Sequence, residues 1–276
     1  MEKIFVQNLT LMVTDKCNLD CQHCMRGRKD NVFMSDKTIE NIFDQIDYCL
    51  HLSLCGGEPL LALKQIKKII ETIIEKRTNI SRFGISTNGT HYTKEVDKLL
   101  DELENYCIDY ADKFLLPNEK HYCHIDLSWN RFAHQELLFL KENDYPLFEK
   151  YVKNINNLRQ SKYFGSYRSL GAHLYDEGNA KELHTVKSQL VPMKKYWTTN
   201  NDMLYFGPEL AILNDGTVSE KDGNFDELKA DNSYGNINNQ PLSDILQSAG
   251  KKCRSLKKFN KLTQASVDSY YGINKK

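Results

Sequence analysis

Three cysteines, Cys17, Cys21 and Cys24, lie within the stretch "CNLDCQHC", and the whole chain has eight. Thiolates grouped in this way bind metals or take part in redox chemistry. Structural zinc takes four closed ligands, and the sequence has no second pair of cysteines or histidines at a suitable spacing. A [4Fe–4S] cluster instead has four irons, each of which needs an external ligand. Three cysteines would hold three irons and leave the fourth open for a substrate or cofactor.

Three other polar segments follow predicted strands, as the cysteines follow a strand predicted at 9–13. They are "GGEP" at 56–59, "STNG" at 86–89 and "SWN" at 128–130. The strands are short apolar stretches that alternate with amphipathic helical stripes, which predicts a parallel sheet with right-handed crossovers. This pattern supports either an open doubly wound sheet or a barrel. Because the carboxyl ends of parallel strands meet at one edge, we expect all four segments to surround one site.

The pattern of elements changes toward the end of the chain. A fifth strand is predicted near Leu170–Tyr175, before the change at about residue 200. After it, "LNDGTV" predicts a hairpin that turns at Asn214–Gly216, and "GNINNQPLSDILQS" predicts a short helix.

The composition is that of a globular protein. The chain has 276 residues, of which 40% are hydrophobic and 27% charged, and Lys+Arg and Asp+Glu both number 37. This balance gives no reason to expect a nucleic acid or a membrane surface as partner. The sequence starts without the apolar core of a signal peptide, and no later run approaches the about 18 apolar residues that a membrane helix needs. We therefore expect a cytoplasmic protein whose cysteines are reduced.

The motif C-x3-C-x2-C after the first predicted strand, together with "GGEP" after the second, resembles the radical S-adenosylmethionine (radical SAM) superfamily. "STNGT" (86–90) and Ser128 are similar to family positions as well, so the resemblance covers residues 5 to about 180. It implies an α/β fold, a partial (β/α)6 parallel barrel of the radical SAM type with a small C-terminal extension. It also implies an enzyme that reductively cleaves SAM to a 5′-deoxyadenosyl radical, which abstracts a hydrogen from a substrate. An electron donor such as flavodoxin or ferredoxin is implied as partner.

The resemblance also implies which residues hold the cofactors. Cys17, Cys21 and Cys24 would hold one [4Fe–4S] cluster. The residues that would contact SAM are Gly56, Gly57, Glu58, Pro59, Ser86, Asn88, Ser128 and His23. Glycines allow close approach of the backbone, and the Glu58 carboxylate could meet the ammonium group of SAM. The short polar side chains could equally cap turns, and His23 could stack near the adenine or pack within the loop. No catalytic hydrogen or proton donor is assigned.

The C-terminal part resembles a second family feature, the SPASM-type extension. The similarity lies in the "DG-x-V" turn, the later "GNI" and the segment "DEGNAKEL". It predicts a radical SAM core domain at 1–200 and an extension at 201–276. The extension lacks cysteines for auxiliary clusters, since Cys253 alone lies beyond residue 123. We therefore expect a single cluster. Cys49, Cys55 and Cys123 lie in apolar contexts typical of core residues.

Three functions are consistent with the sequence. The first is radical SAM chemistry on a peptide or protein, which SPASM-type proteins often modify. The second is the same chemistry on a small metabolite or nucleotide. The third is a non-catalytic iron–sulfur or zinc-binding regulatory protein. "GGEP" and "STNGT" weigh against the third, because a structural metal site needs no glycine-rich and polar turns around an open position.

Overall fold

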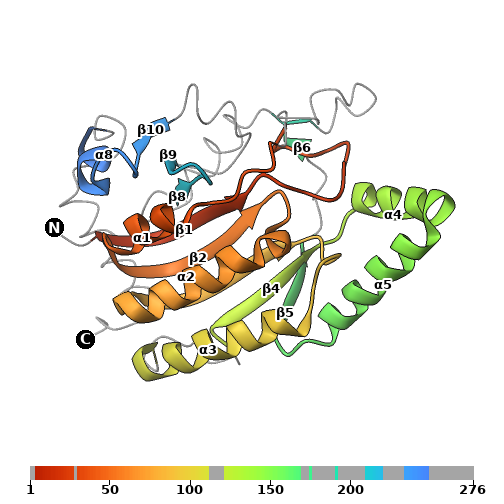
Figure 1. Cartoon of the computed structure of the whole chain (residues 1–276), viewed down its shortest axis with the longest axis horizontal. Coiled ribbons are helices and arrows are strands. Elements are labelled where there is room, and N and C mark those ends of the chain that lie inside the picture. The colour runs from red at the N-terminus through yellow and green to blue at the C-terminus, as the bar shows by residue number, and fades with distance from the viewer. Residues whose placement is uncertain are drawn as a thin grey trace.

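The computed structural model of the chain describes residues 4–27, 30–111, 121–168, 174–175, 190–191, 209–219 and 233–248. Most of the described strands form one sheet, in the order β10-β9-β8-β1-β2-β3-β4-β5 (Figure 1). Their bounds are β1 Ile4–Thr14, β2 Ile46–Gly56, β3 Asn79–Thr87, β4 Cys123–Ser128, β5 Phe164–Arg168, β8 Glu209–Ile212, β9 Thr217–Ser219 and β10 Ser233–Asn236.

Helices connect the parallel strands. The described helices are α1 Asp36–Phe43, α2 Leu63–Lys76, α3 Lys94–Ala111, α4 Arg131–Asn143, α5 Tyr145–Arg159 and α8 Leu242–Ser248, with a 3-10 turn, η1, at Pro59–Ala62. Ser35 is the N-cap of α1, since its Oγ accepts the Thr38 N–H at 3.1 Å. Such a cap satisfies a donor that the first turn leaves unpaired.

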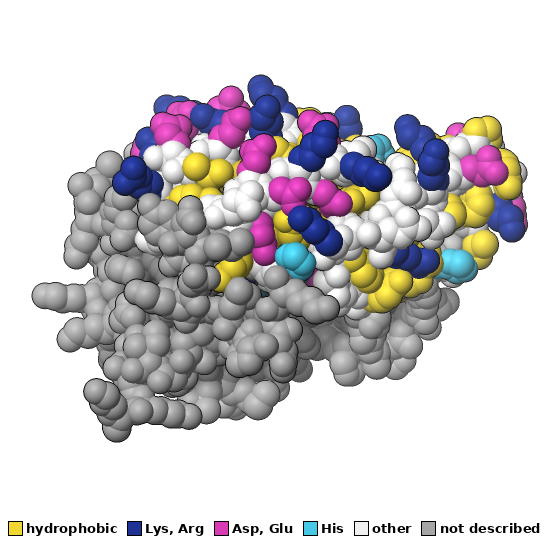
Figure 2. All heavy atoms as spheres, turned by 90° about the horizontal axis from the view of Figure 1, so that it is seen from below, with side chains coloured by type: hydrophobic (Ala, Val, Ile, Leu, Met, Phe, Trp, Pro, Cys, Tyr) yellow, Lys and Arg dark blue, Asp and Glu magenta, His cyan; other side chains and the backbone are white. Residues whose placement is uncertain are grey.

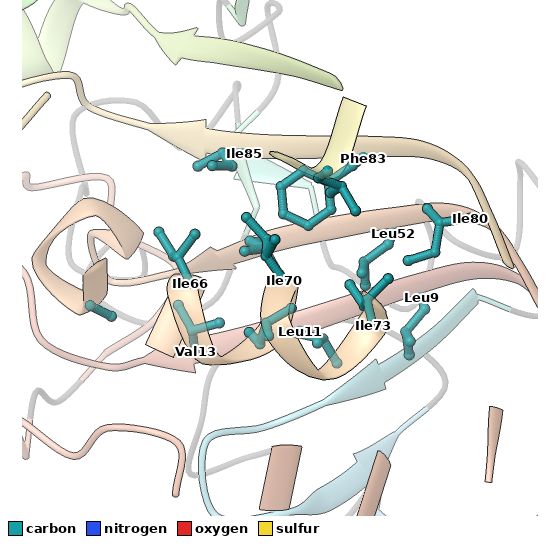
Figure 3. Close-up of a cluster of buried hydrophobic side chains, with 14 of the residues drawn as sticks. Leu9, Leu11, Val13, Leu52, Ile66, Ile70, Ile73, Ile80, Phe83 and Ile85 are labelled. Carbon is teal, nitrogen blue, oxygen red and sulfur yellow. The ribbon is translucent and has the colours of Figure 1, made fainter. Parts of the chain in front are cut away.

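The core lies between the sheet and the helices. In α2, Ile66, Ile70 and Ile73 share one helix face because they are spaced by three and four residues. Figure 3 shows these side chains against the buried side chains that point from one face of the sheet. The labelled sheet residues are Leu9, Leu11, Val13, Leu52, Ile80, Phe83 and Ile85. Because successive residues of a strand point to opposite faces, the other face of the sheet carries a different set.

The order of the strands confirms the expected fold class. Strands β1 to β5 are neighbours in chain order and each pair is parallel. Helices α1, α2 and α3 pack side by side on the same face of the sheet (Figure 1). A doubly wound sheet would carry helices on both faces, whereas winding in one direction is the geometry of a parallel barrel. We call the face turned away from α1, α2 and α3 the inner face.

The fifth strand lies earlier than predicted. It is β5, Phe164–Arg168, which pairs with β4. Leu174–Tyr175 instead forms β6, which pairs with β7, Leu190–Val191, in a separate two-stranded sheet. The segment "FGSYR" has only an irregular alternation of apolar residues, so the sequence pattern did not identify it.

Part of the predicted extension joins the main sheet. The predicted hairpin is confirmed, because β8 and β9 are antiparallel and Gly216 has φ +88° in the turn between them. The predicted short helix is α8. Strand β8 pairs in parallel with β1, from Asn8 opposite Glu209 to Leu11 opposite Ile212. The division at residue 200 stays a prediction, and Cys253 and "DEGNAKEL" lie outside the described residues.

Charges of both signs are mixed on the surface. Figure 2 shows Lys and Arg side chains interspersed with Asp and Glu side chains on the described part of one face. Some of them form ion pairs between neighbouring helices, such as Lys68 with Glu40 at 2.7 Å and Lys76 with Asp44 at 2.7 Å. No helix in the described part of the chain is both long and apolar enough to span a membrane.

Candidate radical SAM site

The loop that carries the three cysteines is closed at its base. The Asp15 carboxylate accepts the backbone N–H groups of Asp30 at 3.1 Å and Val32 at 2.7 Å. The Thr14 hydroxyl donates to the carbonyl oxygen of Val32 at 2.8 Å. Both ends of the cysteine loop are therefore held at the carboxyl end of β1.

The glycines of "GGEP" bring the end of β2 against this loop. The Gly57 N–H donates to the Thr14 carbonyl and the Glu58 N–H to the Lys16 carbonyl, both at 2.8 Å. A Cβ atom on Gly56 would lie 2.1 Å from the Thr14 oxygen, and one on Gly57 would lie 2.4 Å from the Lys16 oxygen. Real Cβ atoms do not approach backbone oxygens so closely. Both positions therefore require glycine for the backbones to meet.

The three cysteines fit a [4Fe–4S] cluster in their number and in their reduced state. Cys17, Cys21 and Cys24 form no disulfide and are half-buried, and the Cys24 N–H donates to the Cys21 carbonyl at 3.0 Å. The Asn88 Nδ2 atom lies 3.9 Å from the Cys17 sulfur and 3.2 Å from the Asn18 Oδ1 atom. Among the described residues, no three His, Cys, Asp or Glu side chains are arranged to hold a metal ion. A cubane cluster differs from such a site because it spreads its thiolates over separate irons.

Glu58 lies inside the protein and accepts three hydrogen bonds. Its carboxylate accepts the Leu60 N–H at 2.9 Å, the Thr87 hydroxyl at 2.6 Å and the Asn88 N–H at 2.7 Å. These bonds join the turn after β2 to the end of β3 and hold Asn88 beside the cysteine loop. The adjacent Pro59 is buried and begins η1. The contact of Glu58 with a SAM ammonium group stays a prediction.

Burial raises the pKa of Glu58 from 4.5 to about 7, against the lowering effect of its hydrogen bonds. The folded protein therefore keeps a proton that the unfolded chain releases above pH 4.5. Stability contributed by this proton is present at low pH and is lost as the pH rises through 7. Between pH 6 and pH 8.5 we expect Glu58 to lower the free energy of unfolding by about 1 kcal/mol. Urea unfolding under anaerobic conditions at the two pH values measures this loss.

The control variants for this effect are Glu58→Gln and Glu71→Gln. Glutamine does not titrate, so Glu58→Gln should remove this part of the pH dependence. It should also be less stable by ~1–2 kcal/mol, because its amide nitrogen faces the Asn88 N–H, a second donor. Glu71 is exposed, and its variant should keep the pH dependence of the wild type. An unchanged pH dependence in Glu58→Gln would refute the assignment to this carboxyl group.

His23 connects the cysteine loop to the end of β4. Its ring stacks on Phe132 with centroids 4.7 Å apart and an interplanar angle of 16°. Its Nε2 atom lies 3.4 Å from the Asn130 Nδ2 atom. The two predicted serines are half-buried at strand ends, with Ser86 near the end of β3 and Ser128 as the last residue of β4. Contacts of these three side chains with SAM stay predictions.

The four polar segments meet as expected, since the cysteine loop contacts segments after β2, β3 and β4. Sequence reasoning gave no individual role to Asp15, Asn18, Thr90 and Asn130. Asn18 Nδ2 donates to the Thr90 hydroxyl at 2.9 Å, and Asn130 caps α4 by accepting the N–H groups of Phe132 and Ala133, each at 3.0 Å. Asn18 beside the first cysteine was a usable signal, as was Asn130 before a helical pattern.

The other described cysteines lie in the core. Burial raises the pKa of Cys49 and of Cys107 to about 12, and raises that of Cys123 as well. Cys55 is also buried, with 7% of its surface exposed. Thiols held in the protonated form are poor metal ligands, so these residues differ from the three in the loop.

Comparisons with known proteins found a family model, sequence relatives and solved structures that are similar to the chain. A family model described as "Radical SAM superfamily" matches residues 11–112. An uncharacterized protein of Methanocaldococcus jannaschii is 32% identical over 103 residues, which are 36% of this chain and 36% of that protein. A GTP 3′,8-cyclase of Clostridium acetobutylicum is 24% identical over 223 residues, which are 72% of this chain and 69% of the cyclase. A solved structure, anSMEcpe with bound AdoMet and Cp18Cys peptide, has a TM-score of 0.48 at 18% identity and covers 94% of this chain and 83% of that one.

Proposed function

Because the chain belongs to the radical SAM superfamily, whose members use a [4Fe–4S] cluster and SAM, we propose that it is an enzyme that cleaves SAM to modify a substrate. Cys17, Cys21 and Cys24 hold the single cluster. When bound, the cluster supplies the electron that cleaves SAM to methionine and a 5′-deoxyadenosyl radical, which abstracts a hydrogen from the substrate. The observation that carries this proposal is the cysteine loop, whose three cysteines form no disulfide and lie where the ends of β2, β3 and β4 meet.

The residues around the loop position the cofactors. Gly56 and Gly57 hold the loop by their close approach to its backbone. The Asn88 amide lies beside the Cys17 sulfur, where an N–H donor stabilises a thiolate. Ser86 and Ser128 offer hydroxyl groups to SAM from neighbouring strand ends. An electron donor of the flavodoxin or ferredoxin type supplies the electron.

The substrate is a peptide or protein. This part of the proposal rests on the SPASM-like sequence features of residues 201–276, the predicted extension of a core predicted at 1–200. A second candidate is a small nucleotide, which is favoured by the cyclase of C. acetobutylicum because the match spans 72% of this chain. Both candidates use the same radical, so one experiment tests the shared chemistry.

The experiment is anaerobic SAM cleavage. The protein is reconstituted with iron and sulfide, given SAM and dithionite, and assayed for 5′-deoxyadenosine and for bound iron. We expect about four irons per chain and nucleoside in amounts that exceed an unreconstituted control. A protein that binds iron but neither binds nor cleaves SAM would refute the proposal and favour the non-catalytic alternative. Assays with peptides and with nucleotides then separate the two substrates by the modified product.

A further inference from the structure

Polar side chains form two neighbouring rows across the inner face of the sheet. His51 of β2 lies opposite Arg82 of β3, and in the next row Ser53 lies opposite Gly84 of β3, which lies opposite His124 of β4. Their chain neighbours Leu52, Phe83 and Ile125 are buried against the helices. The strand alternation thus places the polar residues on the face that the helices leave free.

The absence of a side chain at Gly84 lets two imidazoles converge. A Cβ atom on Gly84 would lie 2.7 Å from the His124 Nε2 atom and 3.3 Å from the His51 Nε2 atom. The two rings are stacked with centroids 5.7 Å apart. Both Nε2 atoms therefore lie close to one position above the middle strand, and an imidazole nitrogen can donate an N–H to a ligand there.

Asp126 lies beside His124, two residues further along β4 on the same face. Its Oδ2 atom lies 3.7 Å from the His124 Nε2 atom, and its Oδ1 atom accepts the Ser166 hydroxyl at 2.9 Å. The Asp126 side chain is only 9% exposed, whereas that of His124 is 28% exposed. The carboxylate thus has partners for both oxygens and gives His124 a charge partner when the ring is protonated. His124 is the member of this pair that a ligand can reach.

The position of His124 relative to Ser128 gives the depth of this cluster. The two residues are four positions apart on β4, so their Cα atoms are separated by ~13 Å at the rise of a parallel strand. The polar residues around His124 therefore lie below the end of the sheet that carries the cysteine loop, on the sheet face that Ser128 and Ser86 share. A molecule that reacts beside the cysteine loop can extend down this face to these polar residues.

We propose that His51, Ser53, Arg82 and His124 bind a carboxylate or phosphate group of the substrate. These four side chains provide donors: a guanidinium with a fixed fork, two imidazoles that converge, and a hydroxyl. Oxyanions are the groups that such donors bind most strongly, through charge-assisted hydrogen bonds. The assignment of this ligand as the substrate rests on the proposed function, whereas the anion site itself does not.

The test is calorimetric titration of the reconstituted full chain with two probes, inorganic phosphate and succinate. We expect at least one anion to bind and its affinity to fall at least tenfold in Arg82→Gln and in His124→Gln. His134→Gln is the matched control, because His134 is an exposed histidine of α4 outside the cluster, and its variant should bind as the wild type does. A preference for phosphate would indicate a phosphorylated small substrate, and a preference for succinate the carboxylate of a peptide.

Two results would overturn the proposal. One is that neither anion binds, and the other is that both variants bind anions as tightly as the wild type. Thermal unfolding checks that the variants are folded. If one of them is not folded, Ser53→Ala, which is a smaller change, is tested in its place. SAM cleavage without substrate separates the two proposals. Nucleoside formation without anion binding refutes only the anion site, and anion binding without nucleoside refutes only the radical chemistry.

Discussion

Replacement of Cys21 by alanine should abolish 5′-deoxyadenosine formation. The loop supplies three thiolates for three corners of the cluster, and with one missing the cluster has two ligands and two open irons. We expect the rate of 5′-deoxyadenosine formation to fall on the order of 1000-fold or more, because the loss of one member of a group that acts as a unit removes most of the group's effect. For the same reason the single variants at Cys17 and Cys24 should lose as much as the triple variant. Nucleoside and bound iron are measured after identical reconstitution.

Cys107→Ala is the matched control for this loss. Cys107 is 1% exposed near the end of α3 and its thiol is protonated, so it should not bind iron. The variant should keep the iron content and activity of the wild type and lose ~1–2 kcal/mol of stability through the lost packing. If Cys21→Ala kept both its iron and its nucleoside formation, the three-cysteine site would be wrong.

Much of the site could be predicted because the topology is simple. Each polar segment follows a short apolar strand, and the ends of neighbouring parallel strands share an edge. The segments that follow neighbouring strands in the sequence therefore lie side by side in space. The contacts of Asn88 with the cysteine loop confirm this, as do the contacts of His23 in that loop with Phe132 and Asn130. The family model confirms the resemblance from which the cofactors were inferred.

What could not be predicted depends on contacts between distant residues. Glu58 is predicted to meet the SAM ammonium group, and two of the three hydrogen bonds that it accepts come from Thr87 and Asn88 at the end of another strand, β3. The fifth strand was missed because Gly165 interrupts its pattern. A Cβ atom there would lie 2.8 Å from the Asp126 Oδ1 atom, so the glycine makes room for a side chain of β4. No local pattern reports such a neighbour.

Gly57→Ala should reduce SAM cleavage on the order of 100-fold, because displacements of about 1 Å in a site can have that effect. The new Cβ atom would lie 2.4 Å from the Lys16 oxygen and 2.5 Å from the Asp15 oxygen. These are backbone atoms, so the cysteine loop itself must move and weaken its hydrogen bonds to Gly57 and Glu58. Iron content and nucleoside formation after reconstitution measure the effect.

Gly216→Ala separates this effect from a general loss of stability. Gly216 has φ +88°, so alanine there is strained as well, but the side-chain end of Asn238, which can move, is the nearest contact. We expect this variant to lose ~1 kcal/mol of stability and to keep its iron and activity. If Gly57→Ala instead behaved like Gly216→Ala, the close approach of "GGEP" to the cysteine loop would be dispensable. Gly56 and Gly57 would then contact SAM itself rather than the cysteine loop, in a space that still has room for a methyl group.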